Sequence, residues 1–321
     1  MAIYNARRRD FQSHSTFMHH VAWGIVCIML ATVLMGIWTN LQTLQRENYL
    51  LKNQLANAKT VQTTCKVKGS WPANTTKQLS LATPSGSRDY LVHLPSSFSS
   101  DHYYPVLMFY PGKGATAAGA EQAYGLDKLP AIVVYPFPSI GTDGATAWEG
   151  APYSSTADDV SFTANILDKL QADLCIDRTK IYAAGMSNGG GFASVLSCEL
   201  PDRFAAYAVV AGAMYYPHGE CKPPVPAPLI SIHSDSDDIV PFTGSVIRRL
   251  PPIYDWTTMR ASMNGCKTKQ ESQSGVTIST TLWTDCTNNS LVKNVQIHGG
   301  GHMWGQMSND FLWQFLSQFS K

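Results

Sequence analysis

The stretch GMSNGGGF at residues 185–192 places one serine among closely spaced glycines. Glycine weakens helices and strands alike unless the backbone needs conformations that other residues avoid. Residues 181–184 have the apolar character of a strand, and residues from Gly190 onward read as a helix. The stretch therefore predicts a strained strand-to-helix turn of the form G-x-S-x-G, which exposes the Ser187 hydroxyl above a sheet.

Apolar runs on both sides of this turn predict further strands. They lie at 79–81, 90–94, 106–110, 131–136, 180–185, 206–212, 228–233 and 294–299. Apolar residues at helical spacing predict helices within 160–174, 192–196 and 312–319. Continuous apolar strands that alternate with helices indicate a mostly parallel sheet with helices on both faces. Residues 66–321 are therefore predicted to form one catalytic domain with an α/β-hydrolase fold.

A serine hydroxyl is a weak nucleophile, so this fold should supply a carboxylate and then a histidine later in the chain. The candidate carboxylates follow the strand at 228–233 and are Asp235, Asp237 and Asp238. The candidate bases are His298 and His302, of which His302 is favoured because it lies beyond three glycines on a loop. His233 ends its own strand and is assigned a structural role. The backbone N–H of Asn188, at the start of the helix, is a candidate oxyanion donor.

Metal and nucleic-acid functions are disfavoured. His298 and His302 have the i, i+4 spacing of two metal ligands on a helix, but the glycines between them make a helix very unfavourable. The net charge of +1 and the 15% charged residues provide no basic surface for nucleic acid. The sequence thus predicts an enzyme that needs neither a metal nor an organic cofactor.

The N-terminal region contains an uncharged apolar segment at 21–38, long enough for a membrane-spanning helix. Arginines at positions 7–9 favour a cytoplasmic tail at 1–20, and therefore a type II protein with an extracellular or lumenal catalytic domain. A cleaved signal peptide, which would make the protein secreted, is the alternative. Residues 39–65 are predicted to form a helical stalk, either a solvated spacer or a short coiled coil that forms a weak dimer.

Six cysteines follow the apolar segment, an even number that suits three disulfides in an oxidising compartment. Cys266 and Cys286 are the pair favoured first, because they flank a strand-like stretch and could close a short loop. Sequons at Asn74 and Asn288 are candidate glycosylation sites and agree with that compartment.

Five ordered blocks resemble the type C feruloyl esterases of fungi and, more distantly, the polyhydroxybutyrate-depolymerase-like esterases, all of the carbohydrate esterase family 1 type. The blocks are RDYLVHLP (88–95), AWEGAPYSSTADDVSF (147–162), KIYAAGMSNGGGF (180–192), HSDSDDIVPF (233–242) and GGGHMW (299–304). The resemblance extends over residues 87–319. It places the acid on Asp237, with Asp238 where relatives often have proline, and the nucleophile and base on Ser187 and His302.

The resemblance also implies residues around the substrate. Trp148 and Tyr153 fall in a block that lies near the substrate in relatives, so they are candidate walls for an aromatic acyl group, with packing as their alternative role. Pro111-Gly112-Lys113 stands where relatives have His-Gly, and the Lys113 backbone is the candidate second oxyanion donor. Glu149 stands where relatives often have glutamine.

These features together predict a serine carboxylesterase that hydrolyses feruloyl esters, such as those of plant cell-wall polysaccharides, through an acyl-enzyme. An acetylxylan or polyester esterase with the same triad is the alternative enzyme. An inactive, membrane-tethered binding module is the alternative from another class, because a fold does not fix a function.

Overall fold

The computed structural model describes residues 67–215, 225–305 and 308–321. The predicted tail, membrane anchor and stalk at 1–65 lie outside the described residues. Among the residues that the structure describes, no helix combines the length and apolar character needed to cross a bilayer.

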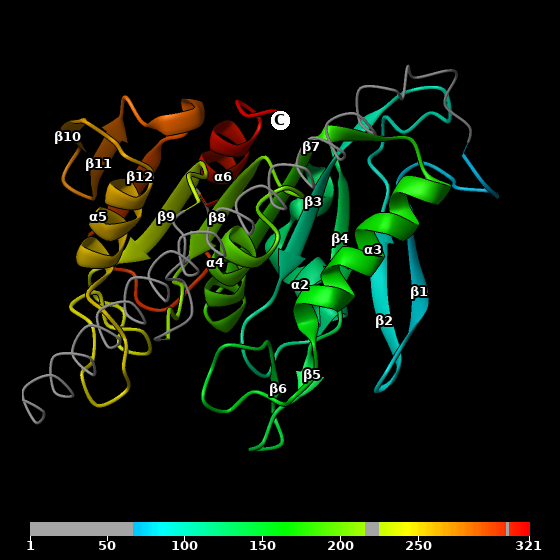
Figure 1. Ribbon diagram of the computed structural model, residues 1–321, viewed down its shortest axis with the longest axis horizontal. Coiled ribbons are helices and arrows are strands. Elements are labelled where there is room, and N and C mark those ends of the chain that lie inside the picture. Colours follow the sequence, from blue (N-terminus) through cyan, green and yellow to red (C-terminus); the bar gives the residue numbers. More distant parts are fainter. Residues whose placement is uncertain (1–66, 216–224, 306–307) are drawn as a thin grey trace, which may run out of the picture. The chain divides into compact units, whose positions relative to one another are not determined.

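The described residues form one ten-stranded sheet in the order β1-β2-β4-β3-β7-β8-β9-β12-β11-β10 (Figure 1). The central strands from β4 to β12 are parallel, and the edge strands pair antiparallel. The strands are β1 (Thr76–Thr83), β2 (Gly86–His93), β3 (Tyr104–Tyr110), β4 (Ile132–Pro136), β7 (Ile176–Met186), β8 (Ala206–Val210), β9 (Leu229–Ser234), β10 (Thr268–Ser274), β11 (Ile278–Thr284) and β12 (Val292–Ile297); a small separate hairpin pairs β5 (Ser139–Ile140) with β6 (Thr146–Ala147).

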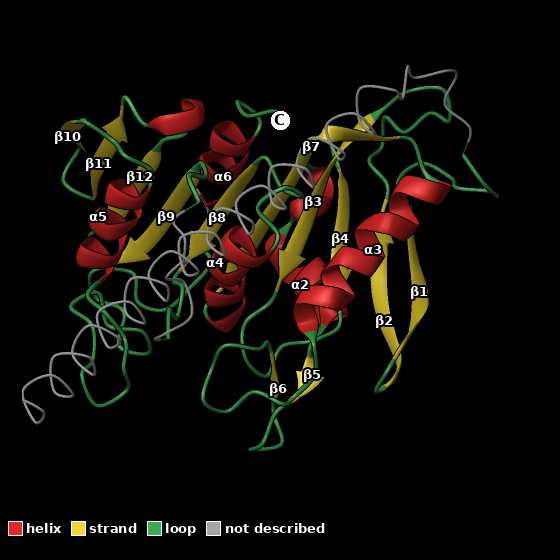
Figure 2. Ribbon diagram, in the orientation of Figure 1, coloured by secondary structure: helices red, strands yellow, loops and turns green. Residues whose placement is uncertain are grey.

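Helices cover both faces of the sheet (Figure 2). One face carries α3 (Asp159–Asp173), α4 (Asn188–Glu199) and α5 (Ile253–Met263), and the other carries α2 (Ala117–Tyr124) and α6 (Ser308–Leu316). Successive side chains of β3 point to opposite faces of the sheet. Met108 and Tyr110 therefore pack in the hydrophobic core under α3, α4 and α5, and Leu107 and Phe109 pack in the core under α2 and α6. The predicted mostly parallel sheet with helices on both faces is confirmed.

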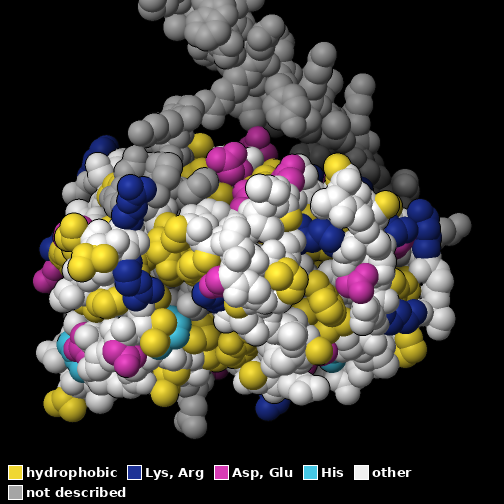
Figure 3. Space-filling view, turned by 90° about the horizontal axis from the view of Figure 1, so that it is seen from below, with side chains coloured by type: hydrophobic (Ala, Val, Ile, Leu, Met, Phe, Trp, Pro, Cys, Tyr) yellow, Lys and Arg dark blue, Asp and Glu magenta, His cyan; other side chains and the backbone are white. Residues whose placement is uncertain are grey.

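Parallel strands bring their carboxyl ends to one edge of the sheet, which is where ligand sites form in open α/β folds. The loops after β3, β7, β9 and β12 all leave the sheet at this edge, and three of them carry Ser187, Asp237 and His302. Figure 3, which views the molecule of Figure 1 from below, shows histidines, charged groups of both signs and hydrophobic groups interspersed on this side.

The sequence predictions of a disulfide and of two glycosylation sites fall on residues that the structure describes. Cys266 and Cys286 form a disulfide with each other, as predicted. Cys175 and Cys198 each take part in a disulfide as well. Asn74 and Asn288 are both exposed. That exposure is compatible with glycosylation at the two sequons, which stays a prediction.

Candidate active site

Ser187 lies between the last residue of β7 and the first residue of α4, with φ 54° and ψ −122°. This conformation is strained for any residue but glycine, and it persists only where the surroundings fix it. The Ser187 N–H donates to the Val210 carbonyl at 2.9 Å, and the Ser187 carbonyl accepts from Gly191 at 3.0 Å and Ala213 at 2.9 Å. The predicted nucleophile elbow is therefore present, with its backbone held on both sides.

The glycines around the serine are required by close backbone contacts. A Cβ on Gly185 would lie 2.2 Å from the Gly189 carbonyl oxygen, and one on Gly189 would lie 2.0 Å from the Tyr110 carbonyl oxygen. A Cβ on Gly112 would lie 3.2 Å from the Ser187 Cβ. The loop after β3 therefore runs directly beside the serine.

Asp237 and His302 form a close pair at the same edge. His302 Nδ1 lies 2.7 Å from Asp237 Oδ2, and the Asp237 side chain is fully buried. The other carboxylate oxygen, Oδ1, accepts from the N–H groups of Ile239 at 3.0 Å and Val240 at 2.7 Å. The carboxylate is thus rigidly oriented toward one nitrogen of His302.

Burial alone would raise the pKa of Asp237, but hydrogen bonds from His233, the Val240 N–H and His302 outweigh it and lower the pKa to about 2. Asp237 is therefore ionised at neutral pH. An ionised acceptor holds the proton of His302 on Nδ1, and this leaves Nε2 as the basic nitrogen.

His233 has a larger part in this arrangement than the sequence indicated. It is buried, and its Nε2 donates to the Val240 carbonyl at 2.8 Å while lying 3.3 Å from Asp237 Oδ2. It therefore packs directly behind the acid. Its position near the end of β9, four residues before Asp237, is the one sequence cue to this contact.

The alternatives Asp235 and His298 form a second pair with each other. His298 Nδ1 lies 2.7 Å from Asp235 Oδ2, and His298 Nε2 lies 2.8 Å from the Ser279 hydroxyl. Both His298 nitrogens are thus engaged away from Ser187, and Asp238 is exposed. Among the described residues no hydrogen bond joins Ser187 to His302, a contact that often tightens only when substrate binds. The geometry favours Asp237 and His302 as the partners of Ser187.

The oxyanion donors predicted from the sequence come from the start of α4 and from the loop after β3. Asn188 begins α4, so its N–H lies at the positive end of the helix. Its buried side chain accepts from the Trp148 N–H at 2.7 Å and donates to the Trp148 carbonyl at 3.3 Å. Lys113 follows Gly112 in the adjacent loop, and its ammonium pairs with Asp143 and lies 4.3 Å from the centre of the Tyr153 ring.

Comparison with known proteins found no matching family model. Feruloyl esterase B of Piromyces equi is 31% identical over 251 residues, which are 73% of this chain and 45% of the relative. A probable feruloyl esterase C of Aspergillus flavus is 24% identical and is covered over 83% of its length. The chain is similar in sequence to these feruloyl esterases. It spans about half the length of the Piromyces relative.

Solved structures support the fold of this chain. An acetyl xylan esterase from Aspergillus awamori is similar with a TM-score of 0.57 at 16% identity, over 76% of this chain and 99% of that one. A ferulic acid esterase of Anaeromyces mucronatus in complex with ferulic acid has a TM-score of 0.51 at 14% identity, over 80% and 96% of the two chains. At such identities the likeness establishes the α/β-hydrolase fold.

The structure places Trp148 differently from the expectation that it forms a wall for the substrate. The Trp148 side chain has no exposed surface, and its ring stacks on Phe192 with centroids 5.3 Å apart. Its Nε1 donates to the Pro111 carbonyl at 2.9 Å. Trp148 therefore joins the loop after β3 to Asn188 from within the core, and it has no face free for an acyl group.

Trp148→Ala is expected to destabilise the fold by about 3–5 kcal/mol, because it removes a large buried ring and leaves a cavity. Trp148→Phe retains a ring beside Phe192 and should lose less. Denaturant unfolding of both variants measures the difference. Equal stability of Trp148→Ala and the unsubstituted protein would contradict this packing role.

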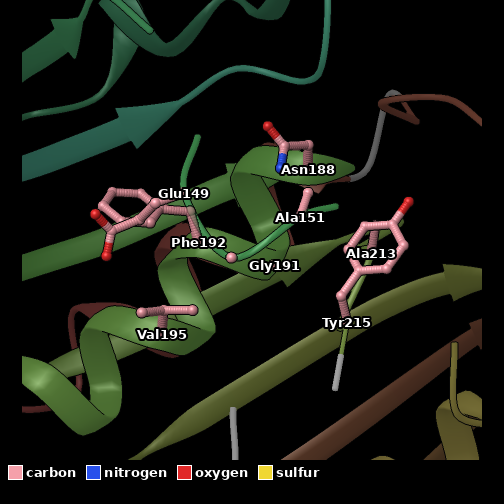
Figure 4. A pocket seen from close by; sticks show the side chains of 9 residues that line it. Glu149, Ala151, Asn188, Gly191, Phe192, Val195, Ala213 and Tyr215 are labelled. Atoms are coloured by element: carbon pink, nitrogen blue, oxygen red, sulfur yellow. The ribbon is translucent and has the colours of Figure 1, made fainter. Parts of the chain in front are cut away.

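A small pocket opens beside α4 (Figure 4). Its walls include Glu149, Phe192 and Tyr215, and Asn188 contributes to it as well. Figure 4 shows Glu149 and Tyr215 on opposite sides of the pocket. Tyr153, the second predicted wall residue, is half-buried and meets Tyr215 edge to face at 5.8 Å. Tyr215 was missed in the sequence because no motif marks the loop after β8.

Glu149 is the acidic group of this pocket. Burial raises the pKa of Glu149 to about 6, although the Asp159 N–H, which donates to Glu149 Oε2 at 2.8 Å, works in the opposite direction. Asp159 is itself held by Arg88 at 2.6 Å. Two of the blocks that resemble feruloyl esterases therefore meet behind this pocket.

Glu149→Gln is expected to remove a pH dependence of stability. The folded pKa of about 6 exceeds the ordinary value of 4.5, so the folded protein binds the proton more tightly and loses stability as pH rises from 4.5 through 6. Glutamine does not ionise and still offers an acceptor to Asp159. The melting temperature of the variant relative to the unsubstituted protein should therefore increase between pH 4 and pH 7. A difference that stays constant over this range would contradict the pKa shift.

Proposed function

We propose that this chain is a serine carboxylesterase that hydrolyses feruloyl and related hydroxycinnamoyl esters, such as those of plant cell-wall polysaccharides. The observation that carries the proposal is the buried Asp237–His302 pair, which lies at the same sheet edge as the strained Ser187 turn. Sequence similarity to feruloyl esterase B of Piromyces equi supports the choice of acyl group.

In the proposed reaction His302 Nε2 accepts the proton of Ser187 as Oγ attacks the ester carbonyl carbon. Asp237 fixes the imidazole and stabilises its charged form. The N–H of Asn188, with that of Lys113 as second donor, stabilises the negative charge on the carbonyl oxygen. The charged His302 then protonates the departing alcohol, and an acyl-enzyme remains. Water, deprotonated by His302, attacks this intermediate and releases the acid together with free Ser187.

The test compares methyl ferulate with an acetyl ester of the same alcohol, with Ser187→Ala as the blank. The proposal expects higher kcat/KM for the feruloyl ester. A preference for the acetyl ester would favour an acetylxylan or polyester esterase, in line with the similarity to an acetyl xylan esterase structure. Failure to turn over either ester would favour a binding module.

The domain is further proposed to be held at a membrane by the apolar segment at 21–38, with the catalytic domain extracellular or lumenal. Retention in membranes after an alkaline wash is the expected result. A soluble product that begins after residue 38 would instead show a cleaved signal peptide and a secreted enzyme. Chemical crosslinking with and without residues 39–65 tests the weak dimer proposed for the stalk.

A further inference from the structure

We propose that Asp235 and His298 form a positioning unit that fixes the loop carrying His302. This inference rests on the proposed function, because it concerns the same general base. The structure pairs His302 with Asp237 and His298 with Asp235, and only the first of these pairs is needed for the proposed chemistry. The second pair has a different task.

The first end of the loop is held by this second pair. Asp235 Oδ1 accepts from the Gly299 N–H at 2.9 Å, while Oδ2 lies 2.7 Å from His298 Nδ1. The neighbouring Ser234 hydroxyl donates to the Gly299 carbonyl at 2.5 Å. Ser234, the last residue of β9, and Asp235, which follows it, therefore bind both backbone polar groups of Gly299.

The glycine segment of the loop has no side chains that could fix its conformation by packing. Gly299, Gly300 and Gly301 have φ angles of 81°, 100° and 72°, and a Cβ on any of them would meet nothing within 4 Å. Gly300 and Gly301, which follow the anchored Gly299, therefore have the greatest backbone freedom in the loop. The direction of His302, the next residue, therefore depends on how the two ends of the loop are fixed.

The far end is fixed by Trp304. Its Nε1 donates to Asn309 Oδ1 at 2.8 Å, and its ring packs against Phe109 at 5.2 Å and Tyr124 at 5.1 Å. This end is thus anchored in an aromatic cluster between α2 and α6. The Asp235–His298 pair is its counterpart at the first end, and His302 lies between the two anchors.

Ser279, His298 and Asp235 form a hydrogen-bonded chain that resembles a second catalytic triad, but the position of Ser279 opposes that reading. Ser279 lies within β11 and is paired with Gln273 of β10 on one side and Gln296 of β12 on the other. Its neighbouring N–H groups therefore belong to the sheet rather than to an oxyanion site. The Ser279 hydroxyl instead completes the orientation of His298.

The test uses His298→Ala and Asp235→Asn in the full chain with the feruloyl ester as substrate. Small displacements of a catalytic group are costly, so each variant should lower kcat by about 10²-fold with little change in KM. The matched control is Asp238→Ala, which changes an exposed carboxylate of the same loop and should leave kcat unchanged. Melting temperatures identify any variant that fails to fold. Asp235→Asn keeps the shape of the side chain, so it is the variant expected to remain folded.

A second background separates positioning from general structural damage. If His298 acts through His302, then His298→Ala should cause no further loss of kcat in a protein that already carries His302→Ala. An equal loss in both backgrounds would overturn the proposal, as would full activity of His298→Ala. Loss of turnover in Ser279→Ala but not in Ser187→Ala would overturn both this inference and the proposed function, whereas the reverse leaves the proposed function standing.

Discussion

Ser187→Ala and His302→Ala are each expected to lower kcat/KM for a feruloyl ester by about 10⁴-fold or more, because the members of such a triad act as one unit. Combining the two substitutions should add little to either alone. Steady-state assays of the purified variants measure these losses, and thermal unfolding establishes that each variant is folded.

The same experiment distinguishes the two histidines. His302→Ala should be far more harmful than His298→Ala, because His298 Nε2 is engaged by Ser279 whereas His302 is oriented by the buried Asp237. The acid follows the same logic, so Asp237→Asn should be severe. A larger loss from His298→Ala, or from Asp235→Asn than from Asp237→Asn, would move the catalytic roles to the second pair.

Gly189→Ala is expected to prevent normal folding or to lower the melting temperature severely. The added Cβ would lie 2.0 Å from the Tyr110 carbonyl oxygen and 2.5 Å from that of Pro111, and neither backbone atom can move without displacing the core of the sheet. Expression yield and thermal unfolding report the effect.

Gly119→Ala is the matched control for this glycine. Gly119 lies exposed in α2, where an added Cβ meets only the Thr116 side-chain oxygen at 3.1 Å. Alanine is the better helix former by about 1 kcal/mol, so this variant should be close to neutral or slightly stabilised. Equal melting temperatures for Gly189→Ala and Gly119→Ala would show that the turn tolerates a side chain.

The nucleophile turn could be predicted because its determinants are local. The glycines beside Ser187 are required by contacts within a few residues or with one neighbouring strand, and strong apolar runs marked the central strands. In contrast, β10 has every residue exposed, and α5 buries the charged residue Arg260 on a weakly amphipathic helix, so neither gave a clear pattern.

The site was predictable only in part, because its geometry depends on contacts between segments that are far apart in the sequence. The candidate acids and bases were visible as residues, but their pairing depends on how the loops after β9 and β12 meet across the sheet edge. The burial of Trp148 likewise depends on the packing of Phe192 and Tyr110 around it, and the sequence does not reveal that packing. The substrate wall was therefore assigned to a residue that holds the core together.

The central claim is that Ser187 forms an acyl-enzyme with a feruloyl group. Rapid acid quenching during turnover of an activated feruloyl ester, followed by peptide mass spectrometry, tests it directly. The account predicts one feruloyl group on the peptide that contains Ser187, and none in Ser187→Ala. A feruloyl group on Ser279 or another residue, or undiminished turnover by Ser187→Ala, would contradict it.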